Sequence, residues 1–389
     1  MSDQPRSRRQ TRAAILGYLL QAGGTFRPPL ANAVRLSEAS LSRILVDLKS
    51  EGLVEEIRHP APYPGGPTGL VSLNAAVRLG ALELTKYTLT VGVGGLNGEL
   101  HYAERLPLPA VPTSDTIARL FHDALQVLRD WTRRRHADPS LIGVSIPGFG
   151  RLSEADNPIV PCDPAQIGRM LDDLFPQVAV EFANAVVAHA TYHRCRTPDY
   201  PFHGSHLFVI VGQGVAGAWM DDPTTTIAEP VELGHMVFGD GGPRCRCGHV
   251  GCVEAYTSLP ALARLLGIAE ADLLQIGNGW IDSIQITPRL RRELRARLHR
   301  LGLAIGNTLN VRPCPGVVIG GWPSLLPEDD RQSLKDGIEA SLLGGFERSQ
   351  VRLAYVAPSS GKDPHVALSF AAASLARRGG MTTSAVEAA

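Results

Sequence analysis

The hydrophobic positions of the first part of the chain recur with a helical period. From Thr11 to Gln21 the apolar residues lie on one face, and Gly23-Gly24 stops the run. Pro28 and Pro29 suit the first turn of a short second helix that extends to Val34. The pattern therefore predicts two successive helices before residue 35.

A third helix is predicted directly afterwards, with Ser37 as its N-cap. Its core-facing residues recur at i, i+3, i+4 and i+7 and are Leu41, Ile44, Leu45 and Leu48. The opposite face carries small or hydrogen-bonding side chains that suit base edges and phosphates, namely Ala39, Ser40, Ser42 and Arg43. Together with Arg27, these are the candidate DNA contacts.

Two strands follow the third helix, at 53–57 and 65–73. Three short helices and a hairpin are typical of a winged helix-turn-helix, although a three-helix scaffold without a DNA role shares this pattern. The Pro/Gly-rich stretch 58–69 is too poor in apolar residues for a core and is expected to be a wing tip or a linker.

Charge separates this segment from the rest of the chain. The formal net charge is zero, yet residues 1–49 contain eight basic and three acidic side chains. The remainder of the chain is correspondingly acidic. A basic module attached to a larger acidic body favours a DNA-binding head on a sensor or an enzyme.

Length and composition limit the class of protein and the number of domains. With 389 residues, 44% hydrophobic and 20% charged, the chain is expected to be globular with two or three domains. No apolar stretch is long enough for a membrane span, and no signal-peptide pattern follows the basic N-terminus. We therefore expect a cytoplasmic protein without a membrane partner.

Three of the six cysteines fall within eight residues, which favours a metal site over disulfides. With His235 they have the spacing H-x9-C-x-C-x4-C, and we expect His235, Cys245, Cys247 and Cys252 to bind one Zn²⁺. Four protein ligands leave no open position for water, so the zinc is predicted to be structural. His249 is an alternative ligand within the same loop.

The motif E-x-G-H followed by C-x-C-G-x-x-G-C-x-E, at 232–254, resembles the signature of the ROK family of repressors, open reading frames and kinases. Further stretches at 143–148, 209–217 and 317–321 are similar to its glycine motifs. The resemblance implies an α/β fold of the actin-like, sugar-kinase type with a ligand cleft between two lobes. We expect a head at 1–73, a first lobe at 74–185 completed by 366–389, and a second lobe at 186–365.

Two motifs of the family kinases are altered here. Leu82–Tyr87 replaces a glycine-rich phosphate loop, and Phe182 stands where the resemblance places the catalytic aspartate. We therefore expect no catalytic residues and no enzymatic activity. The resemblance also implies that Glu181, Asn184, Glu232, His235 and Glu254 contact a sugar, while Glu232 and Glu254 have the alternative role of supporting the zinc loop.

These observations predict a DNA-binding transcriptional regulator, a repressor, controlled by a carbohydrate or a sugar derivative. Its partners would be a double-stranded DNA operator, a sugar effector and a second copy of the chain, as a homodimer or a dimer of dimers. The alternatives are a ROK-type carbohydrate kinase and an orphan regulator controlled by a protein partner.

Overall fold

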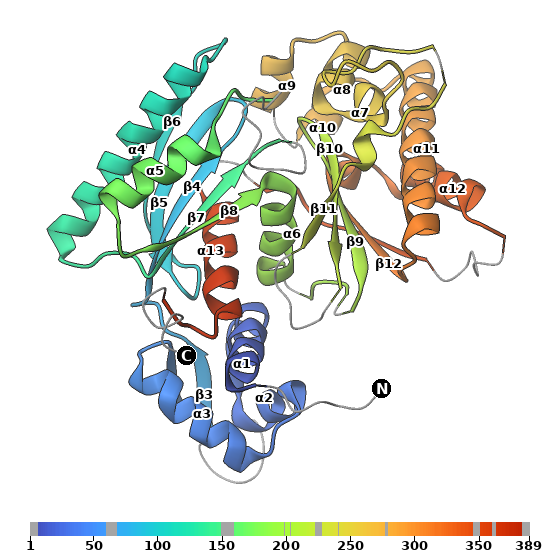
Figure 1. Cartoon of the computed structure of the whole chain (residues 1–389). Coiled ribbons are helices and arrows are strands. Elements are labelled where there is room, and N and C mark those ends of the chain that lie inside the picture. The colour runs from blue at the N-terminus through green and yellow to red at the C-terminus, as the bar shows by residue number, and fades with distance from the viewer. Residues whose placement is uncertain are drawn as a thin grey trace. The chain divides into compact units, whose positions relative to one another are not determined.

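The computed structural model describes residues 7–59, 68–148, 159–197, 199–202, 204–221, 228–239, 241–276, 279–344, 351–359 and 363–382. The chain divides into two compact units (Figure 1). Unit 1 comprises Met1–Pro198, Asp222–Ile227 and Gly361–Ala389, and unit 2 comprises Asp199–Asp221 and Ala228–Ser360. Most of the stretch 58–69 and of the C-terminal tail lies outside the described residues.

Unit 1 begins with three helices and a small antiparallel sheet, which we call the head. The helices are α1 (Arg8–Ala22), α2 (Arg27–Val34) and α3 (Glu38–Ser50). The strands, in the spatial order β1-β3-β2, are β1 (Thr25–Phe26), β2 (Val54–His59) and β3 (Thr68–Leu73). Ser37 caps α3 by accepting a hydrogen bond from the Ser40 N–H, as its sequence position predicts.

The rest of unit 1 is a five-stranded sheet with helices on both faces. In the order β6-β5-β4-β7-β8, the first three strands are antiparallel and the last three are parallel. The strands are β4 (Arg78–Leu84), β5 (Thr88–Gly95), β6 (Leu100–Pro107), β7 (Leu141–Ile146) and β8 (Ala179–Asn184). The helices are α4 (Ser114–Arg135), α5 (Pro164–Leu174), α6 (Ala185–Arg196) and α13 (His365–Arg377).

Helix α13 brings the C-terminal part of the chain back to this sheet. It packs closely on β7 at Gly143, where an added Cβ would lie 2.8 Å from the Cβ of Ala371. Its buried alanines and Leu375 share one apolar cluster with α1 and α3 of the head. Unit 1 therefore has a continuous core from the head to the sheet.

Unit 2 repeats the same sheet topology. Its order is β11-β10-β9-β12-β13, again with three antiparallel strands followed by parallel pairing. The strands are β9 (His206–Val211), β10 (Val215–Met220), β11 (Glu229–Val231), β12 (Gly316–Gly321) and β13 (Arg352–Tyr355). Each sheet thus has the order 3-2-1-4-5 in its own strand sequence, which indicates two related α/β halves.

Helices cover the unit 2 sheet and enclose its apolar cluster. The short elements are η1 (Leu233–His235), α7 (Val253–Thr257), α8 (Leu259–Leu266), α9 (Glu270–Ile276), α10 (Trp280–Ser283) and η3 (Trp322–Leu325). The long helices are α11 (Pro288–Val311) and α12 (Glu328–Ser341). These two approach closely because Gly302 and Gly337 leave no side chain between them.

The predicted domain limits differ from these units. The first lobe was expected to end at 185, but unit 1 continues through α6 to Pro198 because α6 packs on α13 and α1. The head belongs to the same compact unit as the lobe that follows it. Among the described helices, none combines the length and apolar character that a transmembrane segment requires.

Candidate metal, ligand and DNA-binding sites

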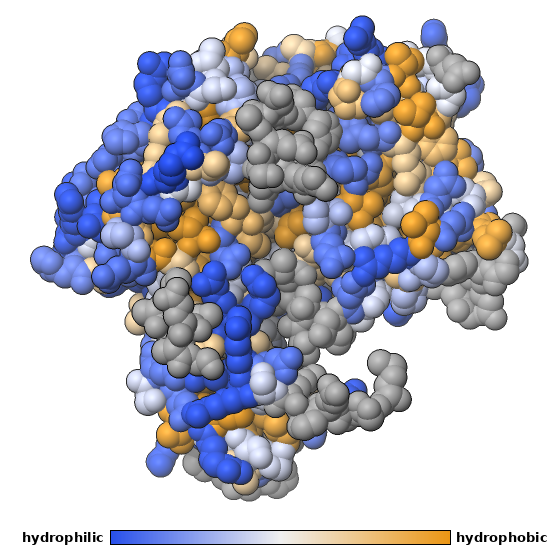
Figure 2. Space-filling view, viewed as in Figure 1, coloured by the Kyte–Doolittle hydropathy of each residue, from blue (hydrophilic) through white to orange (hydrophobic). Residues whose placement is uncertain are grey.

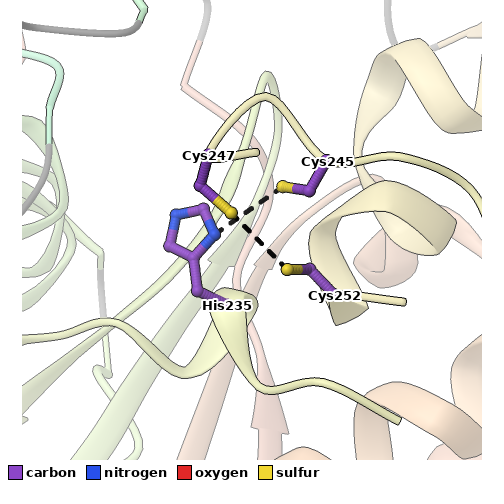
Figure 3. Close-up of side chains that lie close together, drawn as sticks. All are labelled: His235, Cys245, Cys247 and Cys252. Atoms are coloured by element: carbon purple, nitrogen blue, oxygen red, sulfur yellow. Dashed lines mark hydrogen bonds between the residues drawn. The ribbon is translucent and has the colours of Figure 1, made fainter. Parts of the chain in front are cut away.

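Four side chains of unit 2 point toward one centre in Figure 3. His235 ends η1, Cys245 and Cys247 lie in the following loop, and Cys252 precedes α7. Their ligand atoms all lie within 4.8 Å of one another. The group can therefore hold a metal ion.

The distances within this group suit a tetrahedral ion. Cys247 Sγ lies 3.6 Å from Cys252 Sγ, and Cys245 Sγ lies 3.7 Å from His235 Nδ1. Zinc–sulfur bonds of about 2.3 Å place two sulfur ligands of a tetrahedron about 3.8 Å apart. His249 is outside the set of four, and its Nδ1 lies 3.5 Å from Cys247 Sγ.

The loop backbone brings these donors together. Gly251 has φ +84°, and a Cβ there would lie 2.8 Å from the carbonyl oxygen of Gly239. The N–H of Cys245 donates to the His249 carbonyl oxygen at 2.8 Å, and the N–H of Val253 donates to that of Met236 at 3.0 Å. The convergence of the four donors is thus supported by the fold of the loop itself.

The thiols differ in their ionisation. Burial raises the pKa of Cys252 to about 12 and also raises the pKa of Cys245. Partial burial acts in the same direction at Cys247, but hydrogen bonds from His249 and the neighbouring thiols lower its pKa to about 6. Because zinc binds thiolates, metal binding would release protons from this cluster.

Glu254 connects the metal loop to the β9–β10 turn. Its Oε2 accepts a hydrogen bond of 3.0 Å from the Val215 N–H, and its Oε1 lies 3.8 Å from Cys245 Sγ. An added Cβ on Gly214 would come within 2.7 Å of the same carboxylate. Glu232 is more open, and its Oε2 lies 3.9 Å from His235 Nε2. Both carboxylates are therefore next to the metal donors, as each of the two predicted roles requires.

The other two predicted sugar contacts, Glu181 and Asn184, belong to unit 1 and have partners there. Glu181 Oε1 accepts hydrogen bonds from Arg378 Nε at 3.1 Å and Nη2 at 2.5 Å, and Arg377 lies 3.5 Å away. Asn184 caps α6 through Val186 N–H and donates from Nδ2 to the Gly148 carbonyl oxygen at 2.6 Å. A ligand at Glu181 would have to compete with Arg378.

The two altered kinase motifs also lie in unit 1. Phe182 packs beside the apolar cluster that α4 and α5 form with the sheet. The stretch after β4 is a tight turn into β5, closed by a 2.8 Å hydrogen bond from Thr85 N–H to the Thr88 carbonyl oxygen. In unit 2 the Gly212–Gly214 segment connects the two antiparallel strands β9 and β10.

The predicted DNA contacts on α3 differ in exposure. Ala39 and Arg43 are exposed, whereas Ser40 and Ser42 are half-buried. The visible surface of the head carries mostly hydrophilic residues interrupted by apolar patches (Figure 2). Arg43 is thus the candidate contact on α3 that combines charge with exposure.

Arg27 is held within the head. It donates from Nε and Nη2 to the Glu56 carboxylate at 2.5 and 2.8 Å, and from Nη1 to Ser42 Oγ at 3.2 Å. Lys49 Nζ donates to the same carboxylate at 2.7 Å. Hydrogen bonding from Arg27, opposed by burial, lowers the pKa of Glu56 to about 2. Arg27 and Ser42 therefore fasten α2 and α3 to β2, and DNA phosphate would compete with Glu56 for Arg27.

Ion pairs divide the basic residues of the head into two groups. The paired cations are Arg8, Arg12, Arg27 and Lys49. Arg9, Arg35, Arg43 and Arg58 are exposed and form no ion pair with a residue that the structure describes. Arg35 lies between α2 and α3, and Arg58 lies on β2. Sequence reasoning missed these two because pairing depends on the tertiary structure.

The ROK family model matches residues 76–368, and the chain belongs to the ROK family. N-acetylmannosamine kinase of Salmonella typhi is 27% identical over 262 residues, covering 60% of this chain and 82% of that protein. The same enzyme of Citrobacter koseri is 28% identical over 193 residues, covering 44% of this chain and 61% of that protein.

Solved structures support the same fold. A ROK family transcriptional regulator, a homologue of the Escherichia coli MLC protein, has a TM-score of 0.67 at 17% identity, covering 96% of this chain and 97% of that one. A ROK family glucokinase from Streptomyces griseus, solved with glucose and AMPPNP, has a TM-score of 0.54 at 20% identity, covering 77% and 99%. The body therefore has the actin-like, sugar-kinase-type α/β fold.

The curated relatives contradict the prediction that the chain is not an enzyme, because they are kinases that match it over most of their length. That prediction relied on two short motifs, at 82–87 and 181–184. The similarity to the kinases extends over 262 residues. The prediction of no enzymatic activity is therefore wrong.

Proposed function

We propose that this protein is a DNA-binding transcriptional regulator whose body responds to a carbohydrate. The observation that carries the proposal is the position of Arg43 on the exposed face of α3, without an ion-pair partner among the described residues. This helix belongs to a small basic head joined to a ROK family body. Such a regulator combines a DNA-reading element with a ligand-binding element.

The head has the element order of a winged helix-turn-helix. In such a module α3 would enter the major groove, while Arg35 in the preceding turn and Arg58 on the wing strand would meet phosphates. One head offers few phosphate contacts, so we propose that two copies of the chain bind a two-fold operator as a homodimer.

For the body, we propose a structural zinc at His235, Cys245, Cys247 and Cys252. The four protein donors fill a tetrahedral coordination sphere, so the metal would support the loop rather than bind substrate. The loop in turn holds Glu254 beside the Val215 N–H and places Glu232 near His235. Glu232, His235 and Glu254 are the residues of unit 2 that we assign to the sugar, and Glu181 and Asn184 are those of unit 1.

The test is selection of duplexes from a random double-stranded DNA library by the full-length protein, followed by titration. Selective binding that changes when N-acetylmannosamine or glucose is added supports the proposal. Selective binding without a response to any sugar would favour control by a protein partner. Failure to prefer any sequence, with the protein folded, would refute the regulator.

The curated relatives favour a second function of the body, phosphorylation of an N-acetylated amino sugar. Among the carboxylates assigned to the ligand, the Glu232 side chain is the most exposed at 36%, against 20% for Glu181 and 9% for Glu254. Glu232 is therefore the carboxylate best placed to reach a substrate hydroxyl as a general base.

The corresponding assay follows ATP-dependent formation of a sugar phosphate from N-acetylmannosamine. Activity in the native protein that Glu232→Gln abolishes, with Glu99→Gln as an exposed control, supports the kinase. Equal rates with and without protein would exclude phosphorylation of this sugar.

A further inference from the structure

One row of exposed residues along helix α3, which we call the outer line, contains an apolar residue. Ala39, Arg43, Val46 and Ser50 follow at i, i+4, i+7 and i+11, and all four are exposed. Val46 is 60% exposed, while Leu41, Leu45 and Leu48 on the opposite face are at most 1% exposed. The valine therefore lies on the face directed away from the core.

The packing of the fold does not explain why position 46 is a valine. No apolar cluster among the described residues includes it. A β-branched residue is also a poorer helix former than alanine, and its exposed methyl groups remain in water. An exposed valine at this position points to a contact outside the chain.

The charged residues next to Val46 on α3 are paired with charges of opposite sign. Asp47 is paired with Arg8 on one side, and Lys49 is paired with Glu56 on the other. Arg43, one turn earlier on the same line, is the exposed cation with no ion pair to a described residue. The line therefore presents one cation and one apolar group in sequence.

The major groove of B-DNA has matching chemistry. Arginine pairs with the O6 and N7 acceptors of guanine, and the C5 methyl of thymine is the apolar group on the base edges. The helix rise of about 1.5 Å per residue separates Arg43 and Val46 by about 4.5 Å along the axis. This is comparable with the base-pair spacing of about 3.4 Å, so the two side chains would reach neighbouring base pairs.

We propose that Val46 reads the C5 methyl group of a thymine next to the guanine that Arg43 contacts. The inference rests on the proposed DNA-binding function and adds a specificity-determining residue to it. In this proposal the exposed methyl groups of Val46 contact a thymine methyl group and not another protein.

The test uses the full-length protein and the duplex that it selects from a random library. Each thymine of that duplex is replaced in turn by deoxyuridine, which removes only the methyl group, and binding is measured by fluorescence anisotropy. We expect one replacement to weaken binding about three- to fivefold, the effect of one buried methyl group. In Val46→Ala, the same replacement should change affinity less than about 1.5-fold.

Val111→Ala is the matched control, because Val111 is an 84% exposed valine of unit 1 outside the head. Val111→Ala should show the same difference in affinity between the thymine and the deoxyuridine duplex as the wild-type protein. An unchanged difference in Val46→Ala, or no sensitive thymine in the wild-type site, overturns the inference while leaving DNA binding intact. If the wild-type protein selects no duplex, the proposed function fails and this inference fails with it.

Discussion

Arg12 of α1 donates a hydrogen bond of 2.8 Å from Nε to the carbonyl oxygen of Gly379, which lies just beyond α13. Its Nη1 donates to Glu51 Oε1 at 2.7 Å, directly after α3. The Arg12 residue is only 6% exposed. One buried guanidinium thus joins the first helix of the head, the end of α3 and the C-terminal end of the lobe.

Removal of this guanidinium should loosen the head. We expect Arg12→Ala to lower the free energy of unfolding by about 1–3 kcal/mol, because the Gly379 carbonyl loses its buried donor. Amide hydrogen exchange in α1 and α3 should also become faster. Arg8→Ala is the control, since Arg8 forms an ion pair from the same helix but its side chain is 73% exposed; its effect should stay below about 0.5 kcal/mol. Equal effects of the two variants would contradict the role of Arg12.

Loss of one thiol should release the metal. We expect about one zinc per chain in protein purified without added metal or chelator, and almost none in Cys247→Ser, because three ligands no longer close the coordination sphere. Elemental analysis measures both. Cys314→Ala, at a buried cysteine outside the cluster, should retain the zinc. A native protein that is folded and free of zinc would refute the assignment.

The buried carboxylate of Glu83 should make stability depend on pH. Its Oε2 accepts a hydrogen bond of 3.3 Å from the Ala367 N–H. Burial raises the pKa of Glu83 from 4.5 to about 7, although the N–H groups of Ala367 and Val366 oppose this. Between these two pH values the native protein holds a proton that the unfolded chain has released, so this group lowers the free energy of unfolding as pH rises.

Over this pH range the free energy of unfolding is expected to fall by about 3 kcal/mol, because one pKa unit corresponds to about 1.4 kcal/mol. Glu83→Gln should flatten this part of the profile and be more stable than the native protein at pH 8. Urea denaturation at pH 5 and pH 8 measures the difference, with Glu99→Gln as an exposed control. A profile that Glu83→Gln leaves unchanged would show that Glu83 does not titrate in this range.

Two arginines of the head should respond differently in DNA binding. Arg43→Ala should weaken binding to a selected duplex by about 1–3 kcal/mol if Arg43 reads a base, and by less if it meets only phosphate. Arg27→Ala should act mainly on stability, because Arg27 is paired with Glu56 and bonded to Ser42. Salt-dependent titrations and unfolding curves of both variants separate these effects, and an Arg43→Ala variant with native affinity would remove Arg43 from the interface.

Features that depend on neighbouring residues could be predicted from the amino-acid sequence. The two prolines predicted the start of α2, Ser37 predicted the cap of α3, and the leucine period predicted which face of α3 is buried. The four metal donors lie within 18 residues, and their spacing alone predicted the cluster that the loop forms. In each case the cause is local, because caps, helical periods and short loops act over a few residues.

Which charged side chains form ion pairs, and which remain available to a ligand or to DNA, depends on the tertiary packing. Arg12 and Gly379 are 367 positions apart, and Glu181 and Arg378 are 197 apart, so no local pattern predicts either contact. The same holds for Arg27 and Glu56, whose ion pair within the head no local pattern predicts. The prediction of no enzymatic activity was contradicted for a related reason, since it weighed two short motifs and not the whole chain. Partners of a charged group depend on how distant segments pack, and packing is a property of the complete fold.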